Sequence, residues 1–182
     1  DRRRGDKSPE WAGSHYSAVL GLANLRRDEW RLDDAIAMLA PTIDAKVSTP
    51  DWVLPQFLIR RASYRAVRND PAAGDDARRV LNEPPLAPWR DGATNVLKQI
   101  EDRKASGEAA AVASLIPGNR LVAEGKWDEA QKAYEPLRAR DPQNPWIRYR
   151  LAYLDFSRGR PDAALPVFTA LSAAGKTVAE KV

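Results

Sequence analysis

The hydrophobic and polar residues of the chain show no sustained two-residue alternation bounded by hairpin turns, so the pattern predicts no β-strands. Prolines, glycines and acidic residues instead punctuate segments of helical length. The sequence therefore predicts an all-α protein with about nine helices, at residues 9–28, 32–46, 54–68, 72–82, 87–105, 108–124, 127–140, 145–158 and 161–174.

Several predicted helices have distinct starting signals. Ser8-Pro9-Glu10 supplies a capping residue, a proline at the first helical position and an early acid. Proline also precedes tryptophan at Pro88-Trp89 and Pro145-Trp146. Asp70-Pro71 marks a break, because the residue before a proline disfavours helical geometry.

The last third of the chain repeats itself with a period of 34 residues. Small, acidic and aromatic residues recur at matched places, which indicates two copies of one structural unit. The matches are Gly118 with Ala152, Gly125 with Gly159, Lys126 with Arg160, Asp128 with Asp162, Ala130 with Ala164, Tyr134 with Phe168 and Leu137 with Leu171.

This pattern resembles the tetratricopeptide repeat, clearly over residues 111–176 and loosely over 9–83. The resemblance implies an α-solenoid of antiparallel helix pairs wound into a right-handed superhelix. We expect a single helical-repeat domain over 1–182. Within it, we expect a flexible basic tail at 1–8, divergent repeats at 9–83, an additional helix at 87–105 and two regular repeats at 108–176.

Each matched position has a physical role in such a repeat. A small residue allows two helices to approach, a glycine suits the left-handed turn after the first helix, and an aromatic ring fills the space against the next repeat. The predicted packing residues are Gly118 and Ala152 for close approach, Gly125 and Gly159 for the turn, Ala130 and Ala164 at the helix crossing, and Tyr134 and Phe168 at the aromatic position.

A looser form of the second-helix pattern occurs twice in the first half. Asp33-Asp34-Ala35 is followed by Leu39, and Asp75-Asp76-Ala77 is followed by Leu81. Acidic residues in the first turn of a helix favour its dipole. The sequence therefore aligns Ala35 and Ala77 with the alanines of the regular repeats.

The composition argues against catalysis. The chain has no cysteine and a single histidine, His15, so thiol chemistry and the usual zinc and iron sites are excluded. It also has no phosphate-binding loop. We therefore expect neither an enzyme nor a bound cofactor or metal.

Charge and hydropathy limit the classes of partner and location. The net charge of +4 permits contact with acidic surfaces but does not predict nucleic-acid binding. No apolar run approaches the roughly 18 residues that span a bilayer, so we expect no membrane insertion. The start at Asp1 and the lack of cysteine slightly favour an exported protein, and a cytoplasmic one stays open.

Arginines are the main candidates for contacting a partner. Arg60, Arg61, Arg65 and Arg68 cluster on one predicted helix, where Arg61, Arg65 and Arg68 share a face by their spacing of four and three. Arg148 and Arg150 lie on a later first helix. The resemblance implies that first helices line a concave binding surface. Arginine can hold a carboxylate through two parallel hydrogen bonds. The alternative is a solvated helix face whose arginines pair with neighbouring acids.

Asn119 matches an asparagine with which some tetratricopeptide proteins grip a terminal carboxylate. The lysine expected four residues earlier is Leu115, and the second expected asparagine is Arg150. Because these two positions depart from the pattern, we do not expect capture of a peptide C-terminus by that mode.

The six tryptophans are numerous for a chain of this length. We expect most of them to pack one helix pair on the next, and one or two to line a groove or an intermolecular contact. They lie at helix starts (Trp11, Trp52, Trp89 and Trp146) and at turns between paired helices (Trp30 and Trp127).

Two functional hypotheses follow. The first is a protein–protein interaction scaffold that binds a peptide or a helix on its concave face. The second is a structural subunit of an extracellular or envelope assembly, in which copies stack head to tail into an oligomer or filament. Val182 would lie a few residues into another first helix, with no polar capping helix after it, which would suit such stacking.

Overall fold

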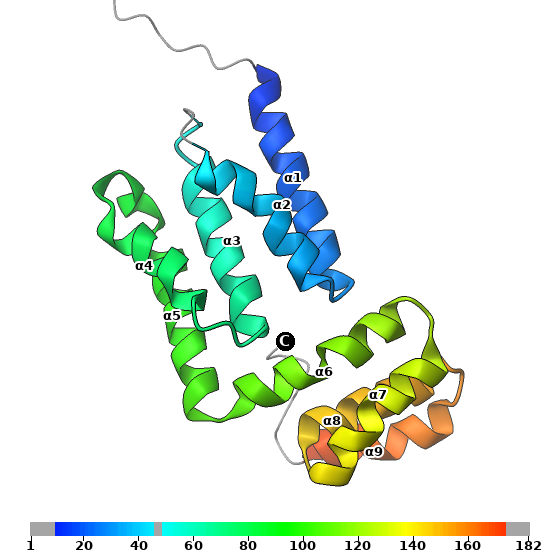
Figure 1. Cartoon of the computed structure of the whole chain (residues 1–182). Helices are drawn as coiled ribbons and strands as arrows, with labels where there is room; N and C mark the ends of the chain where they lie inside the picture. Colours follow the sequence, from blue (N-terminus) through cyan, green and yellow to red (C-terminus); the bar gives the residue numbers. More distant parts are fainter. Residues whose placement is uncertain (1–9, 46–48, 174–182) are drawn as a thin grey trace, which may run out of the picture. The chain divides into compact units, whose positions relative to one another are not determined.

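The computed structural model describes residues 10–45 and 49–173, except for the side chains of residues 10–12. These residues form only helices, turns and loops (Figure 1). The helices are α1 (Glu10–Asp28), α2 (Leu32–Asp44), α3 (Val53–Val67), α4 (Ala73–Asn82), the 3₁₀ helix η1 (Pro84–Trp89), α5 (Arg90–Ala105), α6 (Glu108–Ala123), α7 (Trp127–Arg140), α8 (Pro145–Ser157) and α9 (Pro161–Ala173).

The predicted all-α fold is confirmed, and the predicted helix limits differ from the observed ones by three residues or fewer. The largest difference is at the predicted helix 87–105, whose α-helical part begins at Arg90. Pro84, Pro85 and Pro88 lack the amide hydrogens that α-helical bonds require, so this segment forms a tighter 3₁₀ helix. The predicted basic tail at 1–8 and the start of a further first helix lie outside the described residues.

The chain divides into two compact units, residues 1–109 and 110–182. In the first unit, α1 to α4 pack in succession, and α5 lies against α4 and α3. In the second unit, α7, α8 and α9 pack in succession. A single domain over the whole chain and a right-handed superhelix stay predictions.

One type of turn joins the helices of four antiparallel pairs in the described residues. At the turn from α6 to α7, Gly125 has φ of +73°. Its N–H donates to the Val122 carbonyl at 3.0 Å, and the N–H of Lys126 donates to the Leu121 carbonyl at 2.8 Å. This pair of bonds is the Schellman motif, which satisfies carbonyls at a helix end. It recurs with left-handed Trp30 (φ +59°), Asn69 (φ +57°) and Gly159 (φ +73°).

Small buried residues flank this turn at the same two places in every pair. One lies on the first helix, seven residues before the left-handed residue, and the other lies on the second helix, five residues after it. Because neither carries a large side chain, the two helices can cross closely. The first set is Ala23, Ala62, Gly118 and Ala152, and the second set is Ala35, Gly74, Ala130 and Ala164.

The register of the second pair therefore differs from the one that the sequence favours. Counting from Asn69, Gly74 takes the place of Ala35, and Ala77 lies one turn further along α4. Both residues are buried. The acidic residues misled the alignment because α4 begins later after its turn than the other second helices do.

Aromatic residues complete the packing of the second unit. A Cβ atom added at Gly118 would lie 2.2 Å from Cε1 of Tyr134, so α7 packs its tyrosine directly on the α6 backbone. The Tyr134 hydroxyl donates to Oδ1 of Asn119 at 2.6 Å. Phe168, on α9, lies against Tyr149 of α8 with ring centroids 5.6 Å apart. Aromatic rings thus bridge successive helices of this unit.

Candidate partner-binding groove

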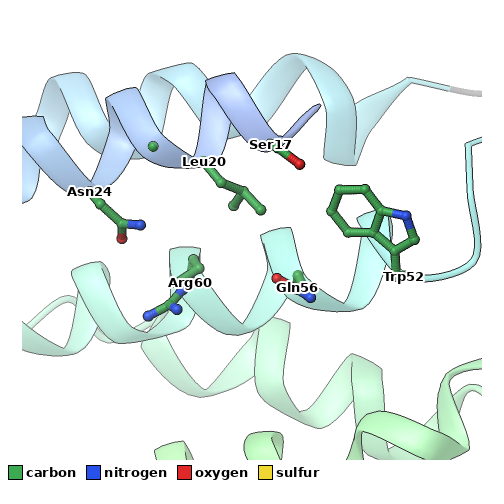
Figure 2. Close-up of a pocket in the computed structure, with 7 residues that line it drawn as sticks. Ser17, Leu20, Asn24, Trp52, Gln56 and Arg60 are labelled. Atoms are coloured by element: carbon green, nitrogen blue, oxygen red, sulfur yellow. The ribbon is translucent and has the colours of Figure 1, made fainter. Parts of the chain in front are cut away.

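An open groove lies between α1 and α3, the first helices of the first two pairs (Figure 2). Its volume is about 490 Å³, within the range of typical ligand pockets. It is lined by Ser17, Leu20, Gly21 and Asn24 from α1, and by Trp52, Gln56 and Arg60 at the start of α3 and along it.

Two contacts hold α1 and α3 side by side beneath this groove. The Tyr64 hydroxyl donates to Oδ1 of Asn24 at 2.6 Å. The rings of Tyr16 and Phe57 meet edge to face, with centroids 6.1 Å apart. Because these contacts lie near different ends of the lining, the spacing of the two helices is fixed along the groove. We call the pair of contacts the α1–α3 brace.

One end of the groove is apolar. Trp52 immediately precedes α3, and in Figure 2 its ring projects from the start of that helix on the side where Ser17 of α1 lies. Leu20 points from α1 toward α3 beside it and is 9% exposed. The indole ring is half-buried, so one part of it remains available to another molecule. This end suits an aliphatic or aromatic side chain.

The other end is polar and positively charged. Arg60 is exposed, and within the described part of the chain no carboxylate lies within 4 Å of its guanidinium. Burial raises the pKa of Tyr64, and the positive charges of Arg60 and Arg27 oppose that rise. Arg27 is already paired with Asp28 at 2.9 Å. Arg60 is therefore the groove's available cation.

Of the four arginines predicted for partner contact on α3, all but Arg60 are bound within the protein instead. Arg61 is 8% exposed, and its Nε and Nη2 donate to the two oxygens of Asp76 at 2.8 and 2.7 Å. Arg65 donates to the same carboxylate at 3.0 Å, and Arg68 pairs with Asp33 at 2.5 Å. These residues tie α3 to α4 and α2, and their role in partner binding stays a prediction.

The candidates in the second unit also contribute to packing. Asn119 is buried and accepts the Tyr134 hydrogen bond. The guanidinium of Arg150 lies 5.5 Å from the centre of the Tyr149 ring, and desolvation lowers its pKa. Arg148 is half-buried on the same helix. These three residues belong to the second unit, and their binding roles stay predictions.

Sequence reasoning missed most of the groove. Arg60 belongs to the arginine cluster proposed from the sequence, but the sequence favoured the face shared by Arg61, Arg65 and Arg68. One residue turns a helix by about 100°, so Arg60 and Arg61 have different surroundings.

The sequence could have identified Asn24 by its place in the repeat. It lies six residues before the left-handed Trp30, as Asn119 lies six residues before the left-handed Gly125. The expectation that one or two tryptophans line a groove agrees with the place of Trp52.

Other site classes receive no support from the described residues. They contain no group of three or more His, Cys, Asp or Glu side chains that could hold a metal ion. None of the described helices has the length and apolar character needed to cross a membrane. His15 is exposed and packs edge to face against Tyr16, with centroids 5.4 Å apart.

Comparison with known proteins identifies one segment. A family model described as tetratricopeptide repeat matches residues 121–180, which include α7, α8 and α9. No curated protein and no solved structure matches the chain. The matched segment contains the turn at Gly159 and the small residues Ala130, Ala152 and Ala164. Residues 121–180 of this chain are therefore similar to the tetratricopeptide repeat.

Proposed function

We propose that the protein is a protein–protein interaction scaffold that binds a segment of another protein in the α1–α3 groove. The observation that carries this proposal is the open, braced groove between the first helices of two successive pairs. The tetratricopeptide repeat at 121–180 supports the general role, because stacked helix pairs offer extended binding surfaces.

The groove suits recognition. It combines an apolar end at Trp52 and Leu20 with a polar end at Asn24 and Arg60. A few convergent polar groups in a mostly preformed cleft fix the orientation of a bound segment. Affinity would come from shape and a few anchoring side chains, and we assign the groove no catalytic role.

Filling the groove tests the proposal. Gly21 lines the groove, and a Cβ added there meets no atom within 4 Å, so Gly21→Trp should fold while occupying the site. Gly13 is the matched control, since it lies on the same helix, has equally open space and does not line the groove. Both substitutions also replace a helical glycine, which favours the helix.

The measurement is selection of a displayed library of random twelve-residue peptides on the full-length protein. Peptides selected on the wild type should bind the Gly13→Trp protein with unchanged affinity and lose most of their affinity for Gly21→Trp. If the selected peptides bind Gly21→Trp as tightly as the wild type, the groove is not the binding site. If no peptide is enriched over an unrelated helical protein, the scaffold proposal itself fails.

Self-assembly is the second candidate function, and one observation favours it. Leu22 and Leu25 of α1 are each 50% exposed and lie three residues apart, so they share a helix face. Two adjacent exposed leucines suit contact with a second apolar surface. Light scattering coupled to size-exclusion chromatography at several concentrations tests this. A monomer at all concentrations would remove the candidate.

A further inference from the structure

We infer that the α1–α3 groove selects an extended peptide segment that carries an acidic side chain and an apolar side chain three or four residues apart. This inference rests on the proposed function and specifies its ligand. It follows from the chemistry of the two ends of the groove, from the distance between them and from the fixed spacing of α1 and α3.

The acidic side chain is recognised at the polar end. Arg60 projects from α3 near Asn24 of α1 in Figure 2. Oδ1 of Asn24 already accepts the Tyr64 hydroxyl, so its amide nitrogen is the part of the side chain left to donate to a ligand. A guanidinium and an amide N–H are both donors, and together they match a carboxylate.

Arg60 differs from most other described arginines of the first unit in having no described carboxylate partner. Most of the first unit's arginines that the structure describes already face a carboxylate, including Arg61 and Arg65 at Asp76 and Arg68 at Asp33. Arg60 differs because its guanidinium is exposed in the groove without such a partner within the described residues. An incoming carboxylate therefore gains an ion pair without breaking an existing one.

The apolar side chain is recognised at the Trp52 end of the groove, about two helical turns away from Arg60. Trp52 and Arg60 are eight positions apart along α3, which corresponds to about 12 Å at a rise of 1.5 Å per residue. An extended chain covers that distance in about three to four residues. The spacing of the two ligand side chains follows directly from the spacing of Trp52 and Arg60.

The segment must be extended because no third helix fits between α1 and α3. A helix with its side chains is about 10–12 Å wide. The α1–α3 brace keeps the two helices in direct contact, through the Tyr64–Asn24 hydrogen bond at 2.6 Å and the Tyr16–Phe57 contact. A helical ligand could therefore not enter the space between the two helices as an extended chain can.

The library selected on the wild-type protein provides the probe. We expect enriched peptides to pair Asp or Glu with a large apolar residue three or four positions away. A synthetic peptide of that sequence should bind Arg60→Gln about tenfold more weakly or worse, as expected for loss of a charge-assisted contact. Arg90→Gln is the matched control, because Arg90 is also an exposed arginine of the first unit but lies on α5, away from the groove.

A charge exchange gives the sharpest test. Arg60→Glu should abolish binding of the acidic peptide and restore binding of the same peptide with lysine in place of its acid. If the peptides lose affinity for Gly21→Trp but bind Arg60→Gln as tightly as the wild type, the acidic specificity is overturned and the scaffold proposal stays intact. Enriched sequences without an acid at the stated spacing would overturn it as well. Peptides insensitive to Gly21→Trp would refute the proposed function, and the inference with it.

Discussion

Gly118→Ala is the substitution for which the structure predicts the clearest effect on stability. A methyl group at Gly118 would lie 2.2 Å from Cε1, 2.6 Å from Cζ and 2.7 Å from Cδ1 of Tyr134. Ordinary contacts begin at 3.4 Å, so the ring would have to retreat by about 1 Å or more. Because one whole edge of the ring is involved, a simple rotation cannot remove the clash.

Tyr134 has little freedom to retreat. Its side chain is fully buried, and its hydroxyl is hydrogen-bonded to Asn119 at 2.6 Å. Overpacking a core costs about 1–3 kcal/mol. Breaking the buried hydrogen bond adds a similar amount. Alanine is better than glycine in a helix by about 1 kcal/mol, which offsets part of this. We expect a net loss of about 2–4 kcal/mol in the free energy of unfolding.

Thermal unfolding followed by circular dichroism at 222 nm measures this loss. For a unit of this size, about 2–4 kcal/mol corresponds to a fall in Tm of roughly 10–30 °C. Gly13→Ala is the control, because a Cβ at Gly13 meets no atom within 4 Å. That substitution should leave Tm unchanged or raise it slightly, since it removes a helical glycine without a clash.

The reasoning would be refuted if Gly118→Ala melted at or above the temperature of the wild type. A double-mutant cycle identifies the cause. Shortening the ring in Tyr134→Leu should remove most of the penalty of Gly118→Ala, so that the double variant is at least about 1 kcal/mol more stable than additivity predicts. Strictly additive losses would show that the alanine disturbs something other than Tyr134.

Three further predictions follow from features described above. Gly125→Ala should lower the free energy of unfolding by about 1–2 kcal/mol, because its φ of +73° disfavours a Cβ, and urea unfolding measures this. Asp76→Asn should cost about 3 kcal/mol in the same assay, because it removes the closer counter-charge of the buried Arg61 guanidinium and leaves only Asp44, at 3.7 Å. If either variant unfolds at the same urea concentration as the wild type, the reason given for its loss of stability is wrong. Leu22→Glu combined with Leu25→Glu should abolish any concentration-dependent self-association in light scattering and leave the helical circular dichroism signal unchanged.

The sequence predicted the helices and the regular repeats well, because both depend on local patterns. The 34-residue match placed Gly125 and Gly159 at turns, and both residues are left-handed there. It also placed Ala130 and Ala164 at the helix crossing, and both are buried. These positions are constrained by backbone geometry and by close approach, so few residue types satisfy them.

The first half was harder to predict because its turns do not use glycine. Trp30 and Asn69 adopt the left-handed conformation instead, so the strongest mark of the repeat is missing from the sequence. Without that mark, the register of α4 was taken from its acidic residues and was wrong by three positions. Only the hydrogen bonds of the turns show that all four pairs share one geometry.

The groove could not be predicted because it depends on which charged residues find partners in three dimensions. Arg60 and Arg61 are identical in type and adjacent in sequence. Only the folded position of Asp76, 15 residues after Arg61, gives one of them a structural role. The other is left in the groove by the rotation of α3.

The α1–α3 brace has a kinetic consequence. Because the Tyr64–Asn24 hydrogen bond and the Tyr16–Phe57 contact hold the two helices before any ligand arrives, association does not have to wait for a conformational opening. The observed rate should therefore rise linearly with peptide concentration, with no plateau, and differences in affinity between peptides should arise mainly from their residence times. In Tyr64→Phe the brace loses its hydrogen bond, and a slow isomerisation step would then limit the capture of peptide.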